Sequence, residues 1–542
     1  MEKREDWKSI LPYLPVVMRP PSLFWPCQVV EALRELGCGR VDSGRLLFIF
    51  ITELRNSLSL SPEPLAPSTA HGYALFFDEL ISREECRKWF DEVLPALGDL
   101  LLRLPSLLEA HYEDADMVID GVGATVRTGL RMLDSQEAGA VFLTQELIAA
   151  LLACSFLCLF PVHDRYEKQL QPVNFDELFA SLYDDYSQKQ ENKIWCIIHY
   201  FERISSDMPK GVVSFERKVF PWEDDSFHIS YPNANFWSTS VMPLCRFEVH
   251  SSGLIEDHSS EAVEVDFANE YLGGGALRRG CVQEEIRFMI SPELIAGMLF
   301  LPSMADNEAI DIVGVERFSS YKGYASSFRF SGDYMDDKDV DALGRRKTRI
   351  VAIDALCGPG MRQYREKYLL REINKAFCGF LQQSKYQQYK KIPQENFDAV
   401  TSTSMETSEG ENSYQDIRNS HNDSVMMEKS NDIGVATGNW GCGAFGGDPE
   451  VKTIIQWLAA SQAQRPFIAY YTFGLGELQK LDKRVLLVSW QVACWILSQR
   501  WTVGDLWSML VEYSTSRSKG ETNVGFLKWL LPSVYAHGSG MD

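Results

Sequence analysis

The chain has 542 residues, 45% of them hydrophobic, so it is long and apolar enough for roughly two to four domains with large cores. A short peptide or a wholly disordered tail is therefore excluded. Acidic residues outnumber basic ones by 75 to 53, and the formal charge of −22 disfavours a protein that coats duplex nucleic acid. Any polyanionic ligand must be bound at a local site.

Cysteine usage and the longest apolar run bear on location. The 12 cysteines include no Cys-x-x-Cys pair, and the chain opens with the charged run MEKREDWKS instead of a signal peptide. We expect reduced thiols and an intracellular protein, in the nucleus, the cytoplasm or both. The apolar run at 147–160 is shorter than the roughly 20 residues that cross a bilayer, so it predicts a buried helix and no membrane association. The 9 histidines form neither His-Glu-x-x-His nor a Cys/His cluster, so no metal site is expected.

From residue 7 to about residue 190 the sequence is mostly of helical type. Apolar residues recur at three- and four-residue spacing in 76–104 and in 143–160. One more helix is expected at 194–204, followed by strands at 212–220, 246–256, 310–318, 349–355 and 466–474 and by helices at 370–383 and 449–461. The pattern predicts an α/β or α+β domain over residues 193–542, preceded by an all-helical domain over residues 1–192.

One segment interrupts the second domain. Residues 394–438 are dominated by Ser, Thr, Asn, Asp and Glu and contain few core-forming side chains. Such a composition buries too little apolar surface to order itself, so we expect a disordered insertion there.

The stretch from Val263 to Ile290 contains the densest set of functional candidates. A strand-like run ends in Asp266 and Asn269, three glycines follow at 273–275, and two adjacent glutamates open a helix. Glycines let a backbone approach a ligand closely with its N–H groups exposed, as phosphate-binding loops do. Three glycines also form ordinary flexible turns, so the triplet alone decides nothing.

The two glutamates, Glu284 and Glu285, permit two interpretations. Acidic residues in the first turn of a helix are favoured by the macrodipole, by roughly 0.3–1 kcal/mol. Alternatively, adjacent carboxylates raise the pKa of one of the pair, which makes a protonated acid available near neutral pH. With Asp266 and Asn269 as hydroxyl-binding groups and the glycines as an anion site, the second interpretation places a sugar, a phosphate and an acid together. A protonated acid is what cleavage of a glycosidic bond requires.

A second glycine-rich run, GNWGCGAFGGD at 438–448, precedes a helical pattern. Its backbone amides are expected at a helix N-terminus, the usual place for a diphosphate, and an ordinary strand-to-helix turn is the alternative. The aromatic residues Tyr321, Tyr324 and Phe473 lie beside small residues, and core packing is their default interpretation.

In chain order, GLIED, VDFAN, GGG, QEEIRF, YKGYA and NWGCGAFGGD closely resemble the motifs of the poly(ADP-ribose) glycohydrolase family, and the chain as a whole is similar to its plant members. The resemblance covers nearly the whole chain, and the glycine triplet followed by Gln-Glu-Glu is the family signature. It implies a macrodomain, in which a mixed sheet flanked by helices binds ADP-ribose, joined to a helical accessory domain. It also implies hydrolysis of the ribose–ribose bonds of poly(ADP-ribose), chiefly from chain ends, with the protein-linked unit left in place.

The resemblance also implies roles for single residues. Glu285 matches the catalytic acid/base, and Glu284 and Asp266 match the carboxylates that hold the ribose at the scissile bond. The implied substrate-binding residues are Gln283 and Asn269 beside that ribose, Ile255 and Glu256 at the adenine edge, Gly273, Gly274 and Gly275 in the first glycine loop, Tyr324 and Phe473 against the adenine, Tyr321 at a phosphate or ribose, and Asn439, Gly441, Gly443, Ala444, Phe445 and Gly446 in the diphosphate loop.

The chemistry of this bond indicates a mechanism. Its cleavage develops positive charge on the ribose C1″ and negative charge on the leaving 2′-oxygen, so Glu285 is expected to protonate that oxygen and then to activate a water. No metal or redox cofactor is needed, and the expected partner is poly(ADP-ribose) on modified proteins, bound by a monomer. Two alternatives stay open, a non-catalytic ADP-ribose-binding macrodomain, which the intact Gln-Glu-Glu disfavours, and a hydrolase of mono-ADP-ribosylated substrates.

Overall fold

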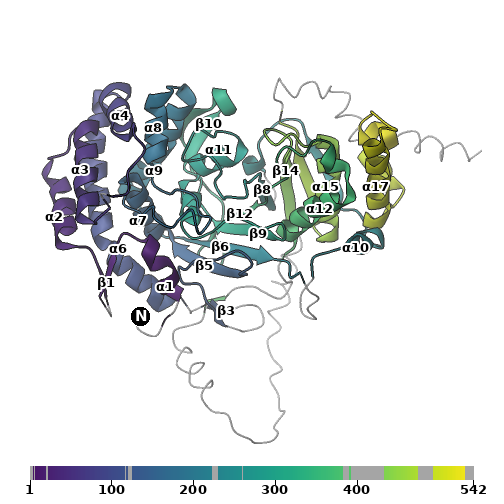
Figure 1. The fold of residues 1–542 in the computed structure, drawn as a ribbon, viewed down its shortest axis with the longest axis horizontal. Helices are drawn as coiled ribbons and strands as arrows, with labels where there is room; N and C mark the ends of the chain where they lie inside the picture. The colour runs from purple at the N-terminus through teal and green to yellow at the C-terminus, as the bar shows by residue number, and fades with distance from the viewer. Residues whose placement is uncertain are drawn as a thin grey trace, which may run out of the picture.

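The computed structural model describes Arg4 and residues 6–19, 22–60, 62–115, 118–119, 125–222, 230–258, 261–382, 390–391, 433–473 and 492–530. Within this part, a large mixed sheet lies between two layers of helices. Figure 1 shows the helices of the N-terminal part, in purple and blue, on one side of the sheet, and α12, α15 and α17, in green to yellow, on the other.

The N-terminal part is a set of packed helices. They are α1 (Asp6–Ile10), α2 (Cys27–Glu35), α3 (Gly44–Ser57), α4 (Thr69–Ala74), α5 (Arg83–Lys88), α6 (Leu94–Asp114), α7 (Gln145–Phe156), α8 (Asp176–Asp184) and α9 (Gln188–Ser206). The helix expected over 76–104 is interrupted at Ile81 because Ser82 and Glu85 form a capping box that starts α5 afresh. Every residue of α7 except Glu146 is buried, as the apolar run at 147–160 predicts.

The main sheet has eight strands in the spatial order β5-β6-β9-β12-β8-β14-β15-β7. Their bounds in that order are Gly139–Thr144, Val212–Val219, Glu308–Gly314, Arg346–Ala352, Ala262–Asp266, Gly434–Gly438, Phe467–Tyr471 and Arg246–His250. The five strands from β12 to β7 are mutually parallel, whereas β5, β6 and β9 continue the sheet with antiparallel pairs. The mixed sheet flanked by helices is the fold that the sequence predicts.

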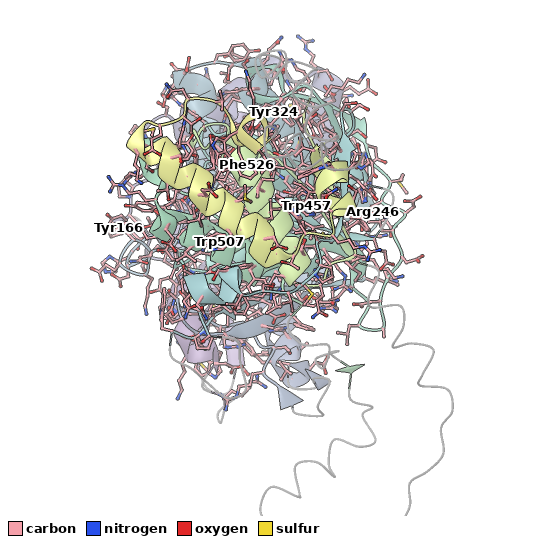
Figure 2. All side chains as sticks on the ribbon, turned by 90° about the vertical axis from the view of Figure 1, so that its right-hand side faces the viewer. Tyr166, Arg246, Tyr324, Trp457, Trp507 and Phe526 are labelled. Atoms are coloured by element: carbon pink, nitrogen blue, oxygen red, sulfur yellow. The ribbon has the colours of Figure 1, made fainter. Side chains whose placement is uncertain are left out.

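Strand β12 supplies side chains to the hydrophobic cores on both faces of the sheet. In β12, Ile350 and Ala352 join the core under α7 and α11 (Gln283–Ile290), whereas Val351 packs on the opposite face. That face is covered by α12 (Glu366–Phe380), α15 (Pro449–Gln462) and α17 (Val503–Lys519). Figure 2 shows α17 crossing the front of this layer beside Trp507 and Phe526, with Tyr324 near the upper edge of the molecule.

Shorter elements complete the described part. They are the hairpin β10 (Ser319–Lys322) and β11 (Arg329–Asp333), the pair β1 (Val17–Arg19) and β2 (Ser22–Phe24), the small strands β3 (Val118–Ile119), β4 (Thr125–Val126) and β13 (Lys390–Lys391), the helix α10 (Ala234–Ser238), and the single-turn or irregular helical segments η1 (Leu11–Tyr13), η2 (Leu36–Cys38), η3 (Leu75–Leu80), η4 (Trp89–Val93), η5 (Ile255–Asp257), η6 (Pro292–Leu299), η7 (Ala325–Ser327) and η8 (Gly360–Tyr364). None of the helices in the described ranges combines the length and the apolar character needed to cross a bilayer.

The domain boundaries differ from those expected. The boundary between residues 192 and 193 falls inside α9, which is one uninterrupted helix. The N-terminal part also contributes a strand, because β5 pairs with β6 at the edge of the main sheet before Thr144 caps α7. The two parts therefore share both a helix and a sheet edge.

The insertion expected at 394–438 extends into a strand at its C-terminal end. Its last residues form β14, which is buried between β8 and β15 near the middle of the sheet. Small and β-branched side chains in the run Gly-Val-Ala-Thr-Gly suit a strand that is covered on both faces. Residues 394–432 lie outside the described part.

Candidate active site

The site is built where the five parallel strands end. Parallel strands present their carboxyl ends at one edge of a sheet, and the segments that follow them converge there. Asp266 is the last residue of β8, and the turn after it leads through the glycine triplet to α11, which begins at Gln283. Two glutamates therefore lie in the first turn of α11, as the sequence predicts, close to the end of β8.

Glu284 is fixed by the turn that precedes it. Its Oε1 accepts a hydrogen bond from the backbone N–H of Gly273 at 2.7 Å, and its Oε2 accepts one from Asn269 at 2.9 Å. The Asn269 side chain in turn accepts from the N–H of Tyr271 at 3.0 Å and stabilises the same turn.

Glu285 is held in the same way from the other side of the turn. Its Oε1 accepts from the N–H of Gly275 at 3.0 Å, and its Oε2 accepts from the N–H of Val282 at 2.7 Å. Of the three carboxyl groups Glu285 keeps the greatest exposure, 7%, against 3% for Glu284 and 0% for Asp266. Glu285 is therefore the carboxyl group best placed to reach a bound molecule.

The N–H groups of the glycine triplet, which we expect at an anion site, are engaged inside the protein. The N–H groups of Gly273 and Gly275 are bonded to the two glutamates, and that of Gly274 is bonded to the carbonyl of Tyr271 at 3.0 Å. Gly273 and Gly274 have φ of +88° and +49°, which glycine adopts without strain. The triplet thus lets the chain fold around two carboxylates instead of a phosphate.

Burial and mutual repulsion keep protons in this cluster. Complete burial raises the pKa of Asp266, and the nearby charge of Glu285 raises it further against a smaller opposing effect of Arg287. Burial, with the charges of Asp266 and Glu285, also holds the pKa of Glu284 well above its usual range. Neither oxygen of Asp266 has a hydrogen-bond partner within the described residues. A neutral carboxyl of this kind can donate a hydrogen bond to a hydroxyl group.

Gln283 connects the carboxylates to the end of β8. Its side chain accepts from the N–H of Phe267 at 2.8 Å and donates to the carbonyl of Val265 at 3.1 Å. The predicted polar contact is thus engaged with the backbone on both sides of Asp266, and it fixes where that carboxyl group lies.

A cavity of about 840 Å³, including its open mouth, is lined by Val282 and Gln283, which directly precede Glu284 and Glu285. The predicted residues that line it are Ile255, Gln283, Tyr324, Asn439, Gly441, Gly443, Ala444, Phe445 and Phe473. The three carboxylates, Asn269, the glycine triplet and Gly446 are not among the lining residues, and Gly446 is exposed.

The second glycine-rich run provides the open donors. Within the described part of the chain, the N–H groups of Gly441, Gly443, Ala444 and Phe445 make no hydrogen bond, and all four residues line the cavity. Successive unsatisfied N–H groups form a concave anion site. The N-terminus of α15 does not take part as expected, because the Asp448 carboxylate already accepts from its first-turn N–H groups.

Buried charged side chains pack against the second glycine-rich run, at Trp440 and Gly441. Lys452 of α15 lies 4.2 Å from the ring centre of Trp440 and forms an ion pair with Glu372. A β-carbon on Gly441 would approach its Nζ to 3.1 Å, so the glycine lets the loop lie directly on the cation.

Two aromatic rings form one end of the cavity. The centroids of Tyr324 and Phe473 are 5.1 Å apart with the rings inclined at 60°. Phe473 has a φ of +49°, which a bulky residue adopts only at an energetic cost, so the fold holds this ring where it is against a local preference. Core packing is therefore not the whole role of this pair.

The two remaining candidates, Tyr321 and Glu256, form a hydrogen bond with each other. The Tyr321 hydroxyl donates to Glu256 Oε1 at 2.6 Å, and burial followed by the Glu256 charge raises the pKa of this tyrosine above its ordinary value. Both residues line a smaller hollow that shares Ile255, Tyr324 and Phe473 with the main cavity. They lie beside the aromatic end of the site.

Several cavity residues were missed from the sequence. They are Phe267, Ala268, Val282, Ala355, Gly438, Trp440 and Tyr471. Phe267 directly follows β8, Ala355 lies shortly after β12, and Gly438 and Tyr471 end β14 and β15. Position at the carboxyl end of a parallel strand is the signal that could have identified them.

The fold and the site together define an α/β domain of the macrodomain type with a helical partner domain. The family model described as "Poly (ADP-ribose) glycohydrolase (PARG), Macro domain fold" matches residues 234–480, and its counterpart described as the helical domain matches residues 81–217. The chain belongs to the poly(ADP-ribose) glycohydrolase family.

Two curated plant relatives are similar along nearly their whole length. Poly(ADP-ribose) glycohydrolase 1 of Arabidopsis thaliana is 55% identical, and the match covers 98% of both chains. Probable poly(ADP-ribose) glycohydrolase 2 of the same plant is 54% identical over 98% of this chain and 100% of that one. Poly(ADP-ribose) glycohydrolase 1 of Caenorhabditis elegans is 32% identical over 54% of this chain and 32% of its own length.

Proposed function

We propose that this chain hydrolyses the ribose–ribose O-glycosidic bonds of poly(ADP-ribose), releasing ADP-ribose and leaving the protein-proximal unit. Membership of the family and the full-length similarity to the plant relatives support this activity. The observation that carries it is the gathering of three buried carboxyl groups at the end of β8 and the start of α11, next to a cavity lined by residues with open N–H donors.

The substrate is oriented by the two ends of the cavity. The diphosphate binds the free N–H groups from Gly441 to Phe445, since these are the donors that the protein leaves unused. The adenine binds against Tyr324 and Phe473, with Ile255 as a neighbouring wall. The terminal ribose then points toward the carboxylates, and Phe445 contacts it from the diphosphate side.

The three carboxyl groups divide the chemistry. Glu284 and Asp266, whose pKa values burial raises, donate hydrogen bonds as neutral carboxyl groups to ribose hydroxyls and orient the sugar. Glu285 gives its proton to the departing 2′-oxygen as the bond to C1″ breaks. The resulting oxocarbenium-like ribose is stabilised by nearby negative charge. Glu285, now a carboxylate, takes a proton from the water that adds to C1″, which restores the acid.

We expect a monomer to carry out the reaction, and no step above requires a metal or redox cofactor. The cysteines assigned in the described part are free thiols, which fits a reducing compartment such as the nucleus or the cytoplasm. The substrate in that setting is poly(ADP-ribose) attached to modified proteins.

The test is a polymer-degradation assay with the purified chain and an auto-modified polymerase. We expect free ADP-ribose to accumulate, and we expect Glu285→Gln to lower kcat by about 10²–10⁴-fold while ADP-ribose binding survives, since the amide keeps the shape but cannot act as an acid. Binding without shortening of the polymer would indicate a non-catalytic reader. Turnover of a mono-modified protein at a comparable rate would indicate the other alternative, a mono-ADP-ribose hydrolase.

A further inference from the structure

Helix α9 carries a buried lysine that contacts residues 273–282, the segment that runs from the glycine triplet to α11, which we call the catalytic turn. Lys193 has no exposed surface, and its Nζ donates to the carbonyl of Arg278 at 2.6 Å and to that of Gly280 at 2.7 Å. The carbonyl of Gly275 lies at 3.5 Å from the same atom. Three carbonyls of one short turn therefore converge on one ammonium group.

The other side of this turn holds Glu285. The N–H groups of Gly275 and Val282, on either side of Gly280, are the donors that fix its carboxylate. Gly280 packs against it so closely that a β-carbon there would lie 2.6 Å from Glu285 Oε1. Lys193 thus anchors the backbone that determines where the acid lies.

Burial of an ammonium group carries a desolvation penalty in free energy. No carboxylate lies within ion-pair distance of Lys193 among the residues that the structure describes. Burial lowers the pKa of Lys193 to about 8, although nearby Cys281 and Glu285 act in the opposite direction. An apolar side chain would fill the space without this desolvation penalty but would leave the carbonyls unbonded.

A second side chain of the helical part contacts the same turn. Gln171 donates through Nε2 to the carbonyl of Gly274 at 3.1 Å. That carbonyl belongs to the peptide group whose N–H, on Gly275, donates to Glu285. Hydrogen bonds linked through one peptide group polarise and strengthen each other.

The next turns of α9 hold the aromatic end of the site. The side chain of Asn192 accepts from the N–H of Phe330 at 2.9 Å, and Trp195 stacks on the Phe330 ring with an interplanar angle of 11°. His199 contacts Asp333 at 3.0 Å. Phe330 and Asp333 lie on β11, the second strand of the hairpin whose connecting turn carries Tyr324.

We propose that Lys193 is a positioning residue for Glu285, and that α9 sets the distance between the acid and the adenine-binding aromatic residues. The helical part then contributes to catalysis without touching the substrate. This inference rests on the proposed glycohydrolase function, because it assumes that Glu285 is the acid.

The decisive variant is Lys193→Met, which keeps the length of the side chain and removes its charge and donors. We expect kcat, counted per ADP-ribose-binding site, to fall about 10²-fold, since a misplacement of about 1 Å at a reacting group has an effect of that size. The KM for polymer and the Kd for ADP-ribose should stay within about threefold, because the adenine and diphosphate contacts lie on other elements.

The matched control is Lys218→Met. Lys218 is also buried, and its Nζ contacts the carbonyls of Gly379 and Leu381 and pairs with Asp311 at 2.7 Å, on the other side of the sheet. We expect this variant to lower Tm and to leave kcat per binding site unchanged. A kcat for Lys193→Met within twofold of wild type would overturn the proposal.

Gln171→Ala keeps the test decisive if Lys193→Met fails to fold, because it removes one hydrogen bond from a half-buried position. We expect about a tenfold lower kcat and an unchanged Kd for ADP-ribose, which is about 1.4 kcal/mol in the transition state. Unchanged kcat in a folded Gln171→Ala protein would contradict the proposal.

Amide hydrogen exchange tests the positioning role of Lys193 independently of the proposed glycohydrolase function. In Lys193→Met, and more weakly in Gln171→Ala, exchange should accelerate in peptides covering residues 273–282 and not in those covering α15. If the wild type fails to degrade polymer, the proposed function is wrong, and the exchange pattern still shows whether Lys193 fixes the turn. Unchanged exchange at 273–282 would overturn the positioning role by itself.

Discussion

Gly274 and Glu284 lie so close together that a β-carbon on the glycine would be 2.5 Å from Oε2 of the glutamate. Contacts this short do not occur in proteins, and Gly274 also has a φ of +49°. Two independent constraints, space and backbone conformation, therefore require glycine at this position.

Gly274→Ala should displace the carboxylates from the ribose position. We expect kcat to fall about 10²-fold with little change in the Kd for ADP-ribose, and a strained left-handed alanine to destabilise the fold by about 1–3 kcal/mol. The control is Gly37→Ala, whose added β-carbon meets nothing within 4 Å. Steady-state kinetics and thermal melts check both variants, and normal kcat in Gly274→Ala would show that the close packing is not required.

Asp266→Asn tests the raised pKa of the buried carboxyl through stability. In the folded protein this pKa is raised, so the proton stays bound at pH values where the unfolded chain, with a pKa of about 4, has released it. Folding stability from this group is complete below about pH 4 and is lost as the pH rises above that value. We expect Asp266→Asn to have a higher Tm than wild type at pH 8, with the difference vanishing toward pH 4.

The control for that experiment is Asp311, a carboxyl group whose pKa is shifted in the opposite direction. Asp311 is half-buried beside Lys218. Burial raises the pKa of this carboxyl group, but the charge and hydrogen bond of Lys218, together with the charges of Arg349 and Arg465, outweigh burial and lower it. Asp311→Asn should therefore reduce stability at pH 8 and less so as the pH falls below the pKa of the unfolded chain. Equal Tm differences at pH 4 and pH 8 for Asp266→Asn would refute the assigned shift.

Removal of either aromatic ring should weaken binding more than turnover. We expect Tyr324→Ala and Phe473→Ala each to raise the Kd for ADP-ribose roughly 10–100-fold, because stacking of a base on an aromatic side chain contributes about 1–3 kcal/mol. The kcat at saturating polymer should change much less. Calorimetric titration with ADP-ribose measures the effect, with Tyr324→Phe to separate the ring from its hydroxyl. Equal losses in kcat and in binding would place the adenine elsewhere.

The segment before β14 can be tested by two deletions. The Arg465 guanidinium donates to the carbonyl of Phe380, at the end of α12, at 2.7 Å and to that of Ile433 at 3.3 Å. The two flanks are thus held together independently of the residues between them. Deletion of residues 394–432 should leave Tm and kcat nearly unchanged, whereas a deletion through 438 removes β14 and should give no soluble folded protein. Loss of solubility with the shorter deletion would show that the segment contributes to the fold.

Apolar periodicity in the sequence was enough to locate the helices and strands that have long regular patterns. The helices around Leu147 and Ile454 and the strand around Val351 are where apolar spacing predicts them. The strand containing Val435 was missed because a five-residue run of small side chains after a long polar segment carries little periodic signal. Its burial comes from partners on β8 and β15 that are distant in the sequence.

Candidate site residues could be predicted from the sequence, but the hydrogen bonds between them could not. The family motifs pointed to Glu285 and to the loop at 439–446, and these roles stay predictions. The motifs could not show that the N–H groups of Gly273 and Gly275 are bonded to carboxylates. They also could not show that Lys193, in what was expected to be a separate domain, bonds to the catalytic turn. Such contacts depend on where distant segments meet, which single-chain spacing does not encode.

The sheet topology has a consequence for how the chain folds during synthesis. β7, at Arg246–His250, has its neighbour in the sheet at Phe467–Tyr471, and β8 is flanked by a strand at Gly434–Gly438. A ribosome must therefore release most of the polypeptide before this half of the sheet can close, and pairing over such long separations is slow. Until then the apolar faces of β7 and β8 are candidates for chaperone binding, so cellular yield depends on the late-emerging strands as much as on the stability of the finished enzyme.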